Sequence, residues 1–291
     1  MKFFWKKSMI LILVLALVFP MLVVADAIPG DVIITLGEDL SESQKQALLN
    51  EMGATQDDTI IYVTNEEEHQ YLGNYISAAR IGTNALSSSK ITIGNEGDGL
   101  AVESTNINWV SDEMYLNALI TAGVEDADIY ITAPIAVSGT AALTGLIKAY
   151  EIAADIEIPE EQKQIANEEL IRTGELSDSI GMEEATELMN RIKEEIANNP
   201  VETESDLRDL IRRIAAELGI TLTDEELNGL VSLFMRMQDL NIDWNQVQDQ
   251  ISRVRDNLGE FLNREETQGF IRNFLDLINR LIDSLRGLFS S

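Results

Sequence analysis

Two stretches that share one order of helix, glycine and strand decide the fold. Residues 47–64 read ALLNEMGATQDDTIIYVT, and residues 118–132 read ALITAGVEDADIYIT. In each stretch an apolar helical segment ends at a glycine, Gly53 or Gly123, as helices commonly do. A strand rich in β-branched and aromatic residues follows. The two stretches predict an internal repeat with a period of about 70 residues.

The residues before the first stretch extend the same pattern. Residues 32–36 form a short apolar strand, and Ser41 with Gln44 makes a capping box that begins the helix ending at Gly53. After the strand at residues 59–64, Asn65 is the predicted N-cap of another helix, whose first turn holds three glutamates. The first half of the chain therefore reads as strands that alternate with helices.

Residues 90–94 and 100–104, between the two copies, alternate apolar and polar side chains as half-buried strands do. They flank a glycine-rich turn at residues 95–99 and so predict a β-hairpin. The turn also holds three oxygen-bearing residues, Asn95, Glu96 and Asp98. A calcium loop needs a longer run that ends in a glutamate, so a solvated turn is favoured.

The second half changes period. From Pro159 onward, apolar residues recur at spacings of three and four, which indicates helices. Thr223 and Glu226 form another capping box, and Asp243 caps the helix after it. We predict an α+β fold, with an N-terminal mixed α/β domain at residues 28–155 that holds the repeat and the hairpin. An all-α helical domain follows at residues 156–291.

The first 27 residues have the pattern of a secretory signal peptide. Three lysines precede an apolar run at residues 9–24, and Ala25-Asp26-Ala27 is a typical cleavage site. The alternative is a membrane anchor, but the run is shorter than the roughly 17 to 25 residues that span a bilayer. We therefore expect an extracytoplasmic protein, secreted or associated with the cell wall.

Composition narrows the classes of partner. The formal net charge is −29, and acidic residues are spread over both halves. Because no basic patch can neutralise a row of phosphates, nucleic-acid binding is disfavoured. The chain has no cysteine, so neither disulfides nor thiolate metal sites contribute. A component of the cell wall or envelope is the expected partner.

The segment at residues 133–145 enters a helix with many small residues. One interpretation is that Ser138, Gly139 and Thr140 bind an anion at the helix N-terminus. The alternative is close packing of the helix on the sheet, with Ser138 as the N-cap. The segment lacks the Gly-Lys-Ser/Thr of a phosphate-binding loop, so packing is favoured.

Carboxylates precede both strands of the repeat and are the candidate metal ligands: Asp57, Asp58, Asp126 and Asp128. They would bind a divalent cation, and we expect no other cofactor. In so acidic a chain, such loop residues also occur by chance. No nucleophile lies at a sequence spacing from the single histidine, His69, that would indicate a catalytic pair. No catalytic set of residues is therefore predicted.

Residues 267–289 predict a final helix with a continuous apolar stripe. The stripe would contact a membrane or a partner, including a second copy of the chain, or else pack inside the helical domain. Because the opposite face mixes both signs of charge, packing is favoured over a membrane surface. The stripe includes Phe270, Phe274, Ile278, Leu281 and Leu285.

The chain resembles the YpuA-like secreted proteins, a family of unknown function from Gram-positive bacteria. The resemblance rests on GDVIITLGEDLSESQK (residues 30–45), EEHQYLGNYIS (67–77), DEMYLNALITAG (112–123), VSGTAALTGLIKAYE (137–151) and TLTDEELNGLVSLF (221–234). It implies an extracytoplasmic, envelope-associated protein and supplies no catalytic residues. We expect a non-enzymatic role in binding or envelope maintenance. The alternative is a secreted hydrolase that uses carboxylates on envelope polymers.

Overall fold

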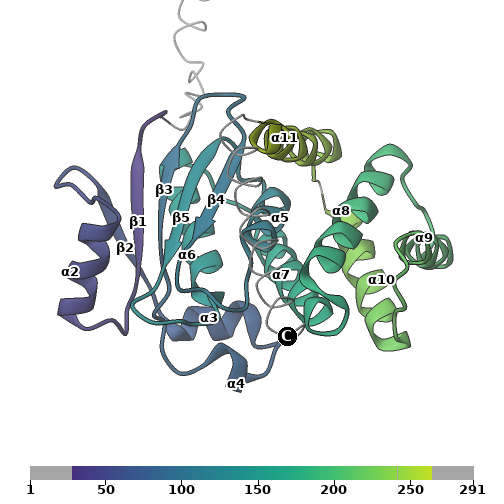
Figure 1. The fold of residues 1–291 in the computed structure, drawn as a ribbon, viewed down its shortest axis with the longest axis horizontal. Coiled ribbons are helices and arrows are strands. Elements are labelled where there is room, and N and C mark those ends of the chain that lie inside the picture. The colour runs from purple at the N-terminus through teal and green to yellow at the C-terminus, as the bar shows by residue number, and fades with distance from the viewer. Residues whose placement is uncertain (1–27, 241, 264–291) are drawn as a thin grey trace, which may run out of the picture.

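The computed structural model describes residues 28–240 and 242–263. A five-stranded sheet has the order β2-β1-β3-β5-β4 (Figure 1). The outer pairs β1–β2 and β4–β5 are parallel, whereas β3 is antiparallel to both of its neighbours. This mixed sheet, with the helices around it, confirms the α+β class. The strands are β1 (Val32–Gly37), β2 (Thr59–Val63), β3 (Ser88–Ile93), β4 (Leu100–Ser104) and β5 (Ala127–Thr132).

Both copies of the predicted repeat form a strand, a helix and a parallel strand. The helices are α2 (Glu42–Glu51) in the first copy and α5 (Asp112–Ala122) in the second. Gly53 and Gly123 follow them with φ angles of +66° and +82°, the left-handed region that favours glycine. The helix-glycine-strand order is therefore confirmed. The two helices cover opposite faces of the sheet, because α2 packs on Ile34 and α5 packs in the core that contains Ile33.

The predicted β-hairpin is wrong. β3 and β4 do not pair with each other, since β5 lies between them and pairs with both. The turn at residues 94–99 therefore has to cross two strand spacings, roughly 10 Å, which six residues span easily. Asp126 holds this turn, because its carboxylate accepts hydrogen bonds from the backbone N–H groups of Gly97 (3.0 Å) and Gly99 (2.6 Å).

Helix α6 (Thr140–Ala154) packs against the centre of the sheet. Its small residues permit a close approach, because a Cβ atom on Gly145 would lie 2.6 Å from Cγ2 of Thr35 on β1. The Thr35 hydroxyl also donates a hydrogen bond to the Gly145 carbonyl (3.2 Å). Gly145, the last residue of the predicted small-residue segment, thus serves helix-on-sheet packing. Two short helices, α3 (Asn65–Leu72) and α4 (Ala78–Ile81), lie at one end of α6 (Figure 1).

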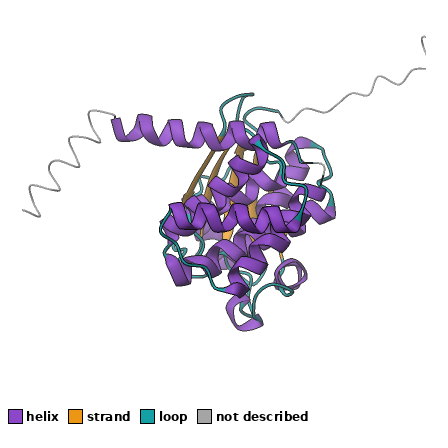
Figure 2. Cartoon of the chain, turned by 90° about the vertical axis from the view of Figure 1, so that its right-hand side faces the viewer, coloured by secondary structure: helices purple, strands orange, loops and turns teal. Residues whose placement is uncertain are grey.

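The C-terminal half of the described chain is helical, as predicted, and its helices lie in front of the sheet in Figure 2. The Thr223 capping box is present, and Asp243 accepts hydrogen bonds from the N–H groups of Asn245 and Gln246. Apolar faces of α7 to α10 form a separate core around Phe234. The helices are α7 (Glu160–Ile180), α8 (Met182–Asn198), α9 (Glu204–Glu217), α10 (Asp224–Asp239) and α11 (Trp244–Asn263).

Two of these helices also belong to the core of the sheet region. Leu170 and Ile171 of α7, and Val247 and Ile251 of α11, are buried in the same cluster as the sheet residue Ile129. The boundary at residue 155 falls where α6 ends and composition changes. Because α7 shares its buried face between both cores, the division into domains 28–155 and 156–291 stays a prediction.

A fully buried ion pair joins α5, α7 and α8. The Lys193 ammonium pairs with the Glu169 carboxylate, and both side chains are inaccessible to solvent. The Thr121 hydroxyl donates to Glu169 (2.5 Å), and Lys193 donates to the backbone carbonyl of Asn117 (2.9 Å). Burial raises the pKa of Glu169 and lowers that of Lys193, while their mutual attraction opposes both shifts.

Two predicted segments lie outside the described residues. They are the signal peptide at residues 1–27 and the apolar stripe that includes Phe270 and Leu285. Within residues 28–240 and 242–263, no helix combines the length and apolar character that a bilayer crossing needs.

Candidate functional site

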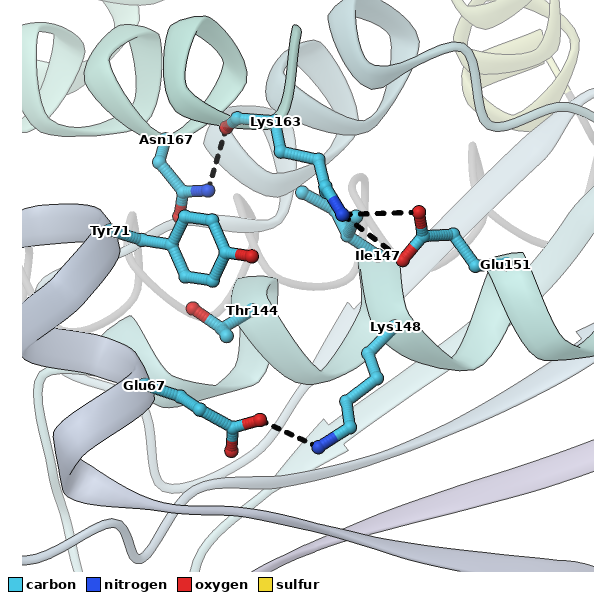
Figure 3. Close-up of a pocket in the computed structure, with 8 residues that line it drawn as sticks. All are labelled: Glu67, Tyr71, Thr144, Ile147, Lys148, Glu151, Lys163 and Asn167. Atoms are coloured by element: carbon cyan, nitrogen blue, oxygen red, sulfur yellow. Dashed lines mark hydrogen bonds and ion pairs between the residues drawn. The ribbon is translucent and has the colours of Figure 1, made fainter. Parts of the chain in front are cut away.

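A cavity of about 220 Å³ lies between α3, α6 and α7 (Figure 3). Three helices that are distant in sequence meet here, because α6 packs on the sheet and α3 and α7 pack beside it. The lining combines four charged side chains with hydroxyl, amide and apolar groups. It consists of Glu67, Tyr71, Thr144, Ile147, Lys148, Glu151, Lys163 and Asn167.

Helix α3 positions Glu67 through its N-terminal cap. Thr64, rather than the predicted Asn65, is the N-cap, because Thr64 keeps an extended backbone and forms a capping box with Glu67. The Glu67 carboxylate also accepts a hydrogen bond from the Lys148 ammonium (2.7 Å). Burial acts to raise the pKa of Glu67, but hydrogen bonds from Lys148 and from the Thr64 N–H lower it below its ordinary value.

A second pair of opposite charges lines the other side of the cavity. The Lys163 ammonium donates to the Glu151 carboxylate (3.2 Å), which also accepts a hydrogen bond from the N–H of Ile158. Burial acts to lower the pKa of Lys163, but its bond to Glu151 raises it. Each lining carboxylate is therefore paired with a lysine. The cavity is charged but close to neutral as a whole.

A second cavity, of about 340 Å³, surrounds the N-terminus of α6 and contains the predicted anion-binding residues. Gly139, with φ +94°, is the N-cap, so the prediction that Ser138 caps the helix is wrong. The Ser138 and Thr140 hydroxyls lie 3.2 Å apart, and Thr140 donates to a carboxylate of the protein itself, that of Glu68 (2.9 Å). Anion binding by these three residues stays a prediction.

Glu68 is a buried ionisable group that the sequence did not indicate. It is only 1% exposed, and it accepts hydrogen bonds from Asn65 and Thr140. Burial nevertheless raises the pKa of Glu68 to about 7, whereas the neighbouring Glu67 shifts downward. One feature of the sequence could have indicated that Glu68 is buried. Leu72, which is also buried, lies one helical turn later and therefore on the same face of the helix.

The predicted metal ligands fall into two groups at the same end of the sheet. Asp57 and Asp58 precede β2, while Asp126 and Asp128 belong to β5 or the turn before it. Since β1 and β3 lie between these strands, the groups are separated by three strand spacings, roughly 14 Å. They do not share one ion, and the structure does not bring them together.

Some of the oxygen-bearing side chains named in the sequence also accept hydrogen bonds within the protein. Asp58 accepts a hydrogen bond from the N–H of Thr55 (2.8 Å), and Asp98 in the glycine-rich turn accepts one from the N–H of Asn95 (2.7 Å). Over residues 28–240 and 242–263, no group of three or more acidic or histidine side chains could hold a metal ion. A divalent cation at Asp57, Asp58, Asp126 or Asp128 stays a prediction. His69 lies 3.2 Å from the Gly82 carbonyl oxygen.

Comparison with known proteins places the chain in one class. It belongs to the family described as a protein of unknown function (DUF1002), whose model matches residues 36–254. It is 50% identical over 290 residues to the uncharacterized protein YpuA of Bacillus subtilis (strain 168), covering 99% of this chain and 100% of that protein. No solved structure matches it. The resemblance found in the sequence is therefore confirmed at the level of the family.

Proposed function

We propose that this protein acts outside the cytoplasm as a binding protein of the cell envelope, and that its ligand occupies the cavity between α3, α6 and α7. The observation that carries the proposal is the state of that cavity's polar groups. Its lysines and carboxylates pair with one another, while Thr144 Oγ1 and Asn167 Oδ1 are buried without a hydrogen-bond partner. Such atoms indicate a place where an external molecule completes the hydrogen bonds.

A carboxylate-dependent hydrolase is the alternative. Such an enzyme needs two carboxyl groups in one cleft whose pKa values are pushed apart. Glu68, with a pKa of about 7, has the property expected of a general acid. Among the described residues, however, no second carboxylate lines its cavity. In the other cavity Glu67 and Glu151 are both paired with lysines. These observations favour binding over hydrolysis.

The extracytoplasmic location is tested by cell fractionation. We expect the full chain to appear in the medium or the wall fraction, because residues 1–27 have the pattern of a cleaved leader. A chain in which a methionine precedes residues 28–291 is expected to stay in the cytoplasm. Retention of the full chain in the cytoplasm would contradict this part of the proposal.

Binding at the cavity is tested with a single cysteine, since the natural chain has none. Lys148→Cys places a thiol in the cavity lining. We expect the dialysable fraction of the producing cells' culture to slow its labelling by a small methanethiosulfonate reagent, because a bound molecule would cover the thiol. Labelling rates are followed by mass spectrometry of the intact protein.

Arg191→Cys on α8 is the matched control. The two natural side chains are similarly exposed, 40% for Lys148 and 35% for Arg191, and each forms one ion pair with a glutamate. Labelling at position 191 is expected to be unaffected by the fraction. Equal labelling rates at position 148 with and without the fraction would exclude a cavity ligand from that source and overturn the proposal.

A further inference from the structure

Two buried polar atoms in the cavity between α3, α6 and α7 have no hydrogen-bond partner. They are Oγ1 of Thr144 on α6, whose residue is 5% exposed, and Oδ1 of Asn167 on α7, which is 1% exposed. Leaving such an atom unsatisfied carries a free-energy cost, because its hydration is lost without a replacement. Both residues line the cavity, where Figure 3 shows them near the Tyr71 ring. A ligand that bonds to both atoms would recover this cost.

The hydrogen bonds already present define what the ligand must offer. The Asn167 amide nitrogen donates to the Lys163 carbonyl (2.8 Å), which fixes the orientation of the amide and leaves its oxygen as an acceptor. The Thr144 hydroxyl is able to donate or accept. A hydroxyl group of a ligand matches both, since it donates to Asn167 and accepts from Thr144. An ionised carboxylate or a phosphodiester has no proton for the Asn167 oxygen.

The charges of the cavity favour a neutral ligand. Lys148 and Glu67 lie 2.7 Å apart, and Lys163 and Glu151 lie 3.2 Å apart. An ion that entered would find its opposite charge already paired, and the loss of its hydration would be poorly compensated. A neutral molecule with several hydroxyl groups avoids this cost.

The size and the lining of the cavity narrow the chemical class of the ligand further. One water molecule needs roughly 10–15 Å³, whereas this cavity holds about 220 Å³. The cavity therefore has room for a molecule much larger than a single water. The Tyr71 ring and the Ile147 side chain supply apolar surface beside the polar groups. A molecule with hydroxyl groups on one side and C–H groups on another fits such a lining.

We infer that the cavity binds one neutral sugar ring, held by hydrogen bonds from its hydroxyl groups to Thr144 and Asn167. The inference rests on the proposed function and names the chemical class of its ligand. Free sugars and the ends of glycan chains share this chemistry. The experiment therefore includes both sources.

The test is calorimetric titration of the protein purified from cells that express the full chain. The probes are glucose, N-acetylglucosamine and the soluble oligosaccharide tetra-N-acetylchitotetraose. We expect saturable binding of at least one probe. Binding of the single sugars points to a free ligand, and binding of the oligosaccharide alone points to a glycan end.

Thr144→Val and Asn167→Leu remove the two unpartnered atoms with little change in volume. Each is expected to weaken binding at least tenfold, because the bound hydroxyl loses its partner. The matched control is Thr186→Val on α8, since Thr186 is also buried with an unpartnered hydroxyl and lies outside the cavity lining. The Thr186→Val variant is expected to bind sugar with the same affinity as the natural protein. Melting curves without sugar show whether each variant is folded.

Three results would overturn the inference. Absence of saturable binding for all three probes would exclude a sugar as the ligand. The proposed function would still stand in that case if the culture fraction protects the thiol of the Lys148→Cys variant from labelling. If no sugar binds and the culture fraction also fails to protect the Lys148→Cys thiol, the proposed function is overturned as well. Unchanged affinity in the folded Thr144→Val and Asn167→Leu variants would show that sugar binds elsewhere.

Discussion

Replacing Lys193 with methionine is expected to lower the free energy of unfolding by about 3–5 kcal/mol. Lys193 and Glu169 are both inaccessible to solvent and neutralise each other between α7 and α8. Methionine has a similar length, so packing changes little. The variant leaves the Glu169 carboxylate buried without its cation, and removes the hydrogen bond to the Asn117 carbonyl. Urea denaturation at neutral pH measures the loss.

Two controls separate the unpaired charge from other effects. The double variant Lys193→Met, Glu169→Leu removes both charges and is expected to recover much of the lost stability, because a buried pair often contributes little beyond an apolar replacement. Arg191 lies on α8, as Lys193 does, and Arg191→Met breaks a solvent-accessible pair with Glu217 of α9, which should cost at most about 1 kcal/mol. If Lys193→Met lowers the free energy of unfolding by less than about 1 kcal/mol, the result would contradict the claim that this ion pair is buried.

The second large effect concerns Glu68 and pH. Its pKa is about 7 in the folded protein against an ordinary value of 4.5. The folded state therefore keeps a proton that the unfolded chain loses. The stabilisation is complete below the ordinary pKa and is lost as pH rises to about 7. The shift corresponds to about 3 kcal/mol at pH 8.

Glu68→Gln removes this titration while keeping the size of the side chain. Between pH 4 and pH 8, we expect the free energy of unfolding of the natural protein to fall by about 3 kcal/mol relative to that of Glu68→Gln. Glu66→Gln is the matched control, since Glu66 lies in the same helical turn and is exposed. Its stability difference is expected to vary little with pH. Parallel curves for Glu68→Gln and the natural protein would contradict a protonated Glu68.

Local features of the fold could be predicted because short-range chemistry determines them. The Ser41 and Thr223 capping boxes each depend on residues within one helical turn. Gly53 and Gly123 mark helix ends because their backbones take the left-handed conformation. Asn65 was predicted as a cap in place of Thr64 because both residue types cap helices, and only the backbone angles distinguish them.

Long-range arrangement was beyond the sequence. The alternation in β3 and β4 predicted strands, but it carries no information on which strand pairs with which, and β5 is inserted between them. Glu169 and Lys193 are far apart in the chain and have ordinary surface residue types, so nothing local indicates that they are buried together. The cavity of Thr144 and Asn167 likewise exists only after α6 and α7 pack.

The central claim is that the cavity between α3, α6 and α7 binds a small molecule, and methyl NMR tests it most directly. Ile147 lines the cavity and is 2% exposed, whereas Ile211 is buried in the helical core away from it. When the dialysable culture fraction is added, the Ile147 methyl signals are expected to shift and saturate while those of Ile211 stay in place. Unmoved Ile147 signals, or equal shifts at both residues, would contradict the claim.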